Sequence, residues 1–370
     1  MYARVSTRRP AWRATALATL TAAALLGAGC NRPTGPTTPP PGPSATTTTT
    51  TAGQPGEPPP GDPGEGCGAA GAVRAGDSTV AVPSGGMSRT YRRHVPPGYD
   101  GTRPTALVVN LHGFSQQGSQ EETLTGFPAL ADRQGFVTVA PNGVGQPPFW
   151  DAQLNSRDLD FVGAVLDHTA ATLCIDPARV YVAGMSNGAF LTSSVACRYG
   201  DRVAAIAAVG GLRDPKGCAT NRPVPVIAFH GTADTFVAYG GGIGSAAARL
   251  PAPDGTGRTL GQVGAGGDER FVPASFNQKV EDVIATWGRR NGCSGGLSTT
   301  KVAADVDKLA PSCPAGAEVE LYRVTGGGHT WPGGNASGLG SIMFGPTTTS
   351  ISASPLAWAF FTAHARPPAG

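Results

Sequence analysis

Short apolar segments that alternate with segments of helical periodicity constrain the fold of this chain most strongly. Runs rich in β-branched residues lie at 106–111, 136–140, 180–183, 203–209 and 224–229. Between them, apolar residues recur at helical spacing over 158–171, 188–199 and 278–290. Strands that alternate with helices predict a mostly parallel sheet with helices on both faces. Continuous apolar strands are typical of strands buried on both sides, so we expect an α/β fold.

The first 66 residues differ in composition from the rest of the chain. Arginines, then an apolar run at 14–28, then small residues ending at Cys30 are typical of an export signal at 1–30. The run, about 15 residues long, is short for a membrane span. Cys30 follows Gly29 and resembles a bacterial lipobox cysteine, so we expect lipidation there, with plain secretion as the alternative. Residues 31–66, almost all Pro, Thr, Gly and Ser, predict a disordered stalk before a folded domain at 67–370.

The charge balance excludes one class of partner. Arg4, Arg8, Arg9 and Arg13 lie in the signal, which contains no acidic residue, so its removal lowers the formal charge of +3 by four, to −1. No basic patch remains to indicate a nucleic-acid partner.

Six cysteines follow Cys30, and an even number in an exported chain permits three disulfides. We expect Cys293–Cys313 to close a loop of about 20 residues that is polar and poor in strand. We also pair Cys197 with Cys218 and Cys67 with Cys174. Reduced, buried cysteines are the alternative, and none of the six shows the C-x-x-C spacing of a metal site.

Two pentapeptides fit the pattern G-x-S-x-G, which can mark a nucleophilic serine: GMSNG at 184–188 and GCSGG at 292–296. Ser186 follows a predicted strand and precedes a predicted helix, which is the order that a sharp nucleophile turn requires. Ser294 follows a helix end, with Gly292 as its C-cap, and no helix comes after it. We therefore interpret Ser186, and not Ser294, as a nucleophile, and we expect a turn at Gly295-Gly296.

A serine nucleophile needs a general base and an acid that orients the base. His329 lies in GGGHTWPGG, a glycine-rich loop after the predicted strand 318–324, where such folds carry functional groups. Asp234 follows another predicted strand in the turn HGTAD. We predict His329 as the base and Asp234 as the acid. His112 precedes the serine and should hold its own loop by hydrogen bonds, and His364 should lie at a helix end.

An oxyanion needs two preorganised backbone N–H groups. We expect them from Asn187, directly after the serine, and from Phe114 in the loop NLHGFSQQG, with Ser115 as the second choice. Trp150 and Trp331 lie in loops expected near Ser186, and we predict that they contact the substrate.

The motifs LHGFSQQG, GMSNGAF, FHGTAD and GGGHTWPGG, in that order, resemble the secreted feruloyl esterase and poly(3-hydroxybutyrate) depolymerase group. The resemblance runs from about Thr90 to His364. It implies an α/β-hydrolase fold, a Ser–Asp–His triad at Ser186, Asp234 and His329, and no metal or organic cofactor. The glycine-rich stretch 239–273 looks long for the group and is a candidate lid.

The export signal and the composition indicate an extracellular or surface-tethered bacterial protein. Few lysines or arginines lie in the motifs, so we expect a hydrolase of uncharged esters, either hydroxycinnamoyl esters of plant cell walls or polyhydroxyalkanoates. The membrane would be a partner only through a lipid anchor. A serine peptidase on the same fold and a non-catalytic surface-binding lipoprotein are the alternatives.

Overall fold

The computed structural model describes residues 66–68, 73–268, 270–272, 274–335 and 343–366. The expected signal, Cys30 and the stalk up to residue 65 lie outside the described residues. The chain divides into Met1–Gly53 and Gln54–Gly370, and all the described residues belong to the second unit.

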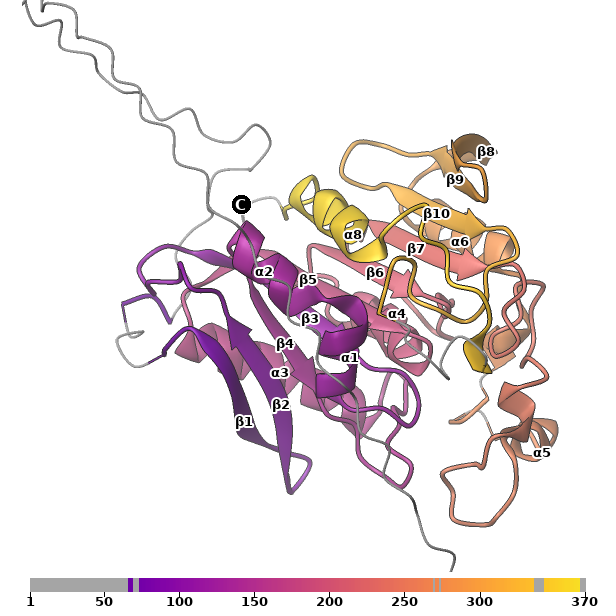
Figure 1. Ribbon diagram of the computed structural model, residues 1–370, viewed down its shortest axis with the longest axis horizontal. Coiled ribbons are helices and arrows are strands. Elements are labelled where there is room, and N and C mark those ends of the chain that lie inside the picture. The colour runs from indigo at the N-terminus through magenta and orange to yellow at the C-terminus, as the bar shows by residue number, and fades with distance from the viewer. Residues whose placement is uncertain (1–65, 69–72, 269, 273, 336–342, 367–370) are drawn as a thin grey trace, which may run out of the picture. The chain divides into compact units, whose positions relative to one another are not determined.

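One sheet of ten strands runs through the described part of the chain, in the order β1-β2-β4-β3-β5-β6-β7-β10-β9-β8 (Figure 1). The strands are β1 (Gly76–Ser84), β2 (Met87–Val95), β3 (Thr105–Leu111), β4 (Val137–Pro141), β5 (Ile175–Met185), β6 (Ala205–Val209), β7 (Val226–Gly231), β8 (Ser294–Ala303), β9 (Val306–Ser312) and β10 (Val319–Val324). From β4 to β10 the six central strands are parallel, whereas β1, β2, β9 and β8 pair antiparallel.

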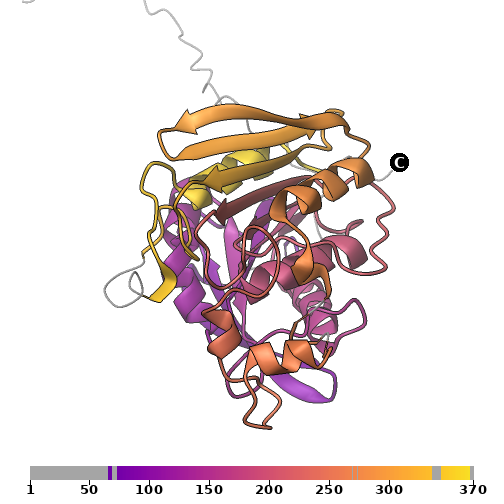
Figure 2. The same ribbon diagram turned by 90° about the vertical axis from the view of Figure 1, so that its right-hand side faces the viewer.

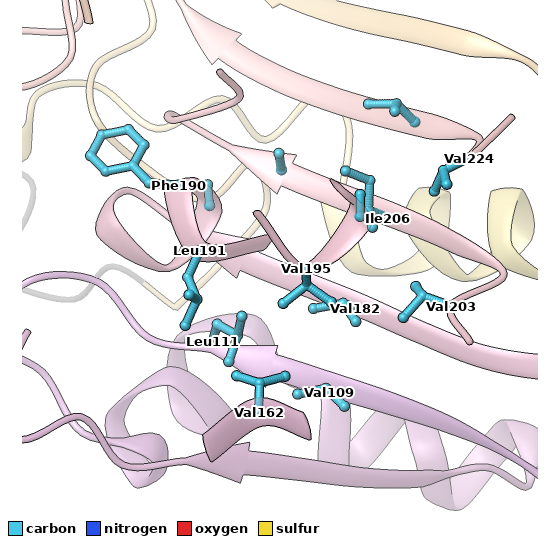
Figure 3. Packing of buried hydrophobic residues seen from close by; sticks show 14 of the residues in the cluster. Val109, Leu111, Val162, Val182, Phe190, Leu191, Val195, Val203, Ile206 and Val224 are labelled. Atoms are coloured by element: carbon cyan, nitrogen blue, oxygen red, sulfur yellow. The ribbon is translucent and has the colours of Figure 1, made fainter. Parts of the chain in front are cut away.

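Helices cover both faces of this sheet. On one face lie α1 (Gly118–Thr125), α2 (Phe127–Gln134) and α8 (Ala353–Thr362), and on the other α3 (Arg157–Thr172), α4 (Asn187–Arg198) and α6 (Val280–Arg290). Figure 3 shows the second interface, where Val162 of α3 and Val195 of α4 pack on Val109 and Val182 of the sheet. The predicted α/β-hydrolase fold is confirmed, with the parallel centre and the two helical layers that the sequence indicated.

The segment between Cys293 and Cys313 corrects one expectation. It is not strand-poor, because β8 and β9 form an antiparallel hairpin at the edge of the sheet, beyond β10 (Figure 2). β8 has the sequence SGGLSTTKVA, so the turn expected at Gly295-Gly296 is wrong and both glycines lie in a strand. This strand is exposed along almost its whole length. Such a strand buries neither face, so it lacks the apolar pattern by which strands are recognised in a sequence.

Three disulfides join Cys67 to Cys174, Cys197 to Cys218, and Cys293 to Cys313, the pairs that we expected. The third closes the open end of the β8–β9 hairpin, and the second ties the end of α4 to the loop after β6. Within the described residues, no helix has the length and apolar character needed to cross a membrane.

Candidate active site

The residues predicted to act together lie at one edge of the sheet. Ser186 follows β5, Asp234 follows β7 and His329 follows β10, while Phe114 follows β3. These four strands are parallel, so their carboxyl ends meet at the same edge. Topology alone therefore brings together residues as far apart in the sequence as Phe114 and His329.

Ser186 has an unusual backbone conformation, with φ 56° and ψ −121°. This region is strained for a residue with a side chain, and such strain is typical of functional turns. The close packing of the turn depends on glycines. A Cβ on Gly184 would meet the Gly188 carbonyl oxygen at 2.6 Å, and one on Gly188 would collide with the Leu111 carbonyl oxygen. The G-x-S-x-G pattern at 184–188 is thus a steric requirement of this strand-to-helix turn.

Asp234 and His329 form a buried hydrogen-bonded pair. His329 Nδ1 donates to Asp234 Oδ2 at 2.7 Å, which leaves Nε2 free to take up a proton. The second carboxylate oxygen accepts the backbone N–H groups of Phe236 (2.8 Å) and Val237 (2.9 Å). His230, which the sequence analysis missed, lies with Nε2 at 3.3 Å from Asp234 Oδ2.

These contacts fix the charge of Asp234. Burial alone would raise the pKa of this carboxyl, but the charge of His329 and hydrogen bonds from His230 and His329 outweigh it. The pKa of Asp234 is held well below its ordinary value, so the carboxylate is ionised at neutral pH and can stabilise an imidazolium.

Packing holds the imidazole of His329 in place. Its ring stacks on Phe236 with centroids 5.0 Å apart, and its backbone N–H donates to the Phe344 carbonyl at 2.6 Å. Ser186 and His329 line the same pocket. Among the described residues no hydrogen bond joins the Ser186 hydroxyl to the imidazole, a looseness that free enzymes commonly show.

The loop after β3 distinguishes between the two candidate oxyanion donors. The N–H of Ser115 donates to the Pro148 carbonyl at 2.8 Å, and that of Gly113 to Gln116 Oε1 at 2.9 Å. Within the described chain, the N–H of Phe114 has no such partner. Phe114 therefore remains the donor that we favour over Ser115. The N–H of Asn187 lies at the start of α4, where the first helical N–H groups lack helical acceptors.

His112 holds this loop, as we expected. Nδ1 donates to the Gly113 carbonyl at 2.8 Å, and Nε2 accepts the N–H of Gly143 at 2.8 Å. Because Nε2 accepts, the ring is neutral, with its proton on Nδ1. Burial lowers the pKa of His112 to about 4, which agrees with a neutral ring at physiological pH.

A pocket of about 880 Å³ opens in front of Ser186. Its walls are mainly apolar and include seven phenylalanines: Phe114, Phe149, Phe190, Phe236, Phe271, Phe276 and Phe344. Arg270 also lines the pocket, but its guanidinium is paired with Asp268 at 2.7 Å. One polar strip, formed by Gln116, Ser119, Gln120 and Thr123, runs along the loop before α1 and along α1.

The predicted substrate contacts of Trp150 and Trp331 are wrong. Trp150 is fully buried, and its Nε1 donates to the His112 carbonyl at 2.8 Å. Trp331 is 1% exposed, packs on Phe127, and donates to Ser354 Oγ at 3.0 Å. Both indoles support the walls from behind. Their burial could not be seen in the sequence, because a loop tryptophan can point toward the pocket or into the core.

Trp150 still affects the site through its backbone. The side-chain amide of Asn187 accepts the Trp150 N–H at 2.6 Å and donates to the Trp150 carbonyl at 2.9 Å. These two hydrogen bonds fix the loop after β4 to the first residue of α4. Because its side chain is anchored in this way, the backbone N–H of Asn187, the expected oxyanion donor, is also held in position.

The candidate lid forms one wall of the pocket. Residues 239–273, of which 269 and 273 lie outside the described set, contain η2 (Ala247–Arg249) and α5 (Leu260–Ala265). A separate small core of Ala252, Leu260 and Val263 holds the segment together. Phe271 contacts Phe149 of the loop after β4, with ring centroids 5.3 Å apart. Whether the segment moves as a lid stays a prediction.

The chain is similar to several known proteins. The sequence profile described as "Esterase PHB depolymerase" matches residues 89–214. NocK of Nocardia uniformis subsp. tsuyamanensis, a candidate esterase, is 31% identical over 67% of this chain and 72% of its own length. The chain belongs to the esterase PHB depolymerase family.

Two other members of this similarity group carry more specific names. Feruloyl esterase B of Piromyces equi is 26% identical over 63% of this chain and 41% of its own length. Poly(3-hydroxyalkanoate) depolymerase C of Paucimonas lemoignei is 29% identical over 65% and 58%, respectively. The chain thus spans less than two thirds of these two relatives. As a member of the family, it is a carboxylic ester hydrolase.

Proposed function

We propose that this family member hydrolyses uncharged carboxylic esters through an acyl-enzyme on Ser186. The observation that carries the proposal is the strained Ser186 turn, which opens into the same pocket as the buried His329–Asp234 pair. A strained turn at the serine is typical of a nucleophile elbow, and an ionised acid behind the imidazole is what a triad base needs.

The reaction would proceed in two steps. Ser186 Oγ attacks the ester carbonyl carbon while His329 Nε2 takes the hydroxyl proton, and the N–H groups of Phe114 and Asn187 hold the oxyanion. The carbon–oxygen bond to the alcohol then breaks, and His329 gives its proton to the leaving alkoxide. Water, deprotonated by His329, attacks the acyl-enzyme, and the carboxylic acid leaves as Ser186 recovers its proton.

The walls of the pocket support an apolar or aromatic acyl group. Seven phenylalanines line it, and its one cationic side chain, Arg270, is neutralised by Asp268. A carboxylate or phosphate on the substrate would therefore find no unpaired cation among the described lining residues. We favour hydroxycinnamoyl esters and short hydroxyalkanoate esters, the two substrate types named in the relatives.

We further propose that the enzyme is exported and tethered through Cys30. Three disulfides support an oxidising compartment, since such bonds form and persist outside the reducing cytosol. Cys30 and the stalk lie outside the described residues, so the sequence pattern alone supports the lipid anchor.

A panel of esters tests the proposed activity. We expect methyl ferulate and hydroxybutyrate oligomers to be hydrolysed with higher kcat/KM than long-chain triglycerides, and peptides to be left intact. Ser186→Ala should lower kcat on the order of 10⁴-fold, because the nucleophile is lost. Ser294→Ala, the matched control from the second pentapeptide, should keep most activity. Cleavage of peptides in preference to every ester would contradict the proposal.

A further inference from the structure

Helix α1 carries polar residues on two opposite sides. Ser119, Gln120 and Thr123 line the pocket, whereas Glu121 and Thr125 are buried against the sheet. Glu121 is 0% exposed. A carboxyl group thus lies beneath the helix, behind the active-site surface, and the proposed reaction does not use it.

The carboxyl of Glu121 lacks partners. Within the described part of the chain, neither of its oxygens has a hydrogen bond, and neither does Asn110 Oδ1 on the neighbouring β3. Asn110 Nδ2 donates to Thr125 Oγ1 at 3.0 Å, and that hydroxyl donates to the backbone carbonyl of Glu121 at 2.9 Å. The space between α1 and β3 therefore holds acceptor atoms without donors, which is a costly place for a carboxylate.

The charged groups on the surrounding elements are already paired. Arg92 of β2 donates to the other buried acid of α1, Glu122, at 3.1 Å. His94 of β2 lies between Asp77 and Asp132, with contacts of 2.7 and 2.8 Å. Farther along, Arg89 is paired with Asp158 at 2.6 Å, and His112 is neutral. No unpaired cation among these groups compensates a charge on Glu121.

Glu121 lies next to the loop that carries the expected oxyanion donor. Burial raises the pKa of Glu121 well above its ordinary value, and the nearby backbone N–H of Gly113, whose hydrogen bond goes to Gln116 Oε1 at 2.9 Å, opposes that shift only in part. Gly113 directly precedes Phe114, and its carbonyl accepts from His112 Nδ1 and from the N–H of Gln116. The carboxyl thus lies close to the residue that directly precedes Phe114.

We propose that Glu121 stays protonated in the folded enzyme and acts as a positioning residue for the oxyanion loop. The neutral acid supplies the donor that the space between α1 and β3 lacks, and it supports Gly113 without adding negative charge behind the oxyanion. An ionised Glu121 would repel that oxyanion and pull water toward the loop. The positioning role rests on the proposed function, whereas the protonation state does not.

A urea-unfolding series tests the protonation state independently of activity. The unfolded chain ionises Glu121 near its ordinary pKa of 4.5, and the folded chain keeps the proton to a higher pH. Above pH 4.5 folding therefore takes up a proton at Glu121. The contribution of Glu121 to stability falls as pH rises, because its ionisation increases the unfolding equilibrium constant by about tenfold per pH unit. Glu121→Gln has no such proton, so its stability relative to wild type should rise tenfold or more between pH 5 and pH 7. If the ratio of the two unfolding equilibrium constants, variant to wild type, were the same at pH 5 and pH 7, the proposal would be overturned.

The positioning role is tested by kcat on p-nitrophenyl acetate. Glu121→Gln, which keeps the shape and a donor, should retain kcat, whereas Glu121→Leu should lose about tenfold in kcat with little change in KM. Glu122→Gln is the matched control and should keep wild-type kcat. Wild type should lose kcat at alkaline pH, and Glu121→Gln should not.

Full kcat in Glu121→Leu, or the same alkaline loss in Glu121→Gln as in wild type, would overturn the positioning role. If Ser186→Ala kept its activity, the proposed function would fail instead. The unfolding series would still report on Glu121.

Discussion

Ser186 occupies a conformation that its neighbours impose on it. Gly184 and Gly188 permit the close packing of the turn, and a Cβ on Gly211 would meet the Ser186 carbonyl oxygen at 2.6 Å. Of these three glycines, Gly184 and Gly188 belong to the pentapeptide and can be recognised in the sequence. Ser294, in the other pentapeptide, begins an exposed edge strand, where nothing requires a strained serine. The same five-residue pattern therefore has two unrelated physical causes in one chain.

His112 leads to a prediction about acid stability. Its folded pKa is lowered to about 4 by burial, from an ordinary 6.5. Between these values the unfolded chain binds a proton that the folded chain does not, so the contribution of His112 to stability should fall by about 3 kcal/mol as pH drops from 6.5 to 4. Urea unfolding of wild type and His112→Gln checks this. The variant should be less stable at pH 7, because it loses the bridge from Gly113 to Gly143, and the difference should narrow toward pH 4.

A difference between the two proteins that stays constant over this range would show that His112 titrates equally in the folded and unfolded chains. The neutral ring that we assign from the Gly143 contact would then be wrong.

At the scale of elements, the buried strands were predictable and the exposed ones were not. The five apolar runs correspond to β3, β4, β5, β6 and β7, because burial on both faces leaves a continuous apolar record in the sequence. The β8–β9 hairpin leaves no such record. Ser186, Asp234 and His329 could also be predicted from the sequence, because strand ends, glycines and chain order together leave few candidates for each role. The pocket walls were not, because Phe190, Phe271 and Phe344 come from segments that share no local pattern.

The aromatic contact between two loops suggests how the acyl group is selected. Phe149 and Phe271 both line the pocket and touch each other, one from the loop after β4 and one from the candidate lid. Phe271→Ala should raise KM for methyl ferulate several-fold and change KM for p-nitrophenyl acetate little, because only the larger acyl group reaches both rings. Trp358→Ala, an aromatic change on α8 outside the pocket, is the control and should alter neither KM. Equal changes for both esters would assign Phe271 a structural role alone.

On the scale of the whole molecule, the sheet acts as a frame that joins distant segments. Four parallel strands deliver Phe114, Ser186, Asp234 and His329 to one edge, and the disulfide Cys197–Cys218 ties the helix after Ser186 to the loop after β6. Helices pack on both faces of this sheet, so the site residues extend from strand ends that a buried core supports. We propose that this sheet presents Ser186 as an activated nucleophile.

Covalent labelling with a fluorophosphonate tests that claim most directly. The reagent reacts with a serine that is activated by a base, so peptide mapping of the labelled protein identifies the nucleophile. We predict one adduct, on the peptide that contains Ser186, and none in Ser186→Ala. His329→Ala should label far more slowly, because the base is missing. An adduct on Ser294, or undiminished labelling of Ser186→Ala, would contradict the account.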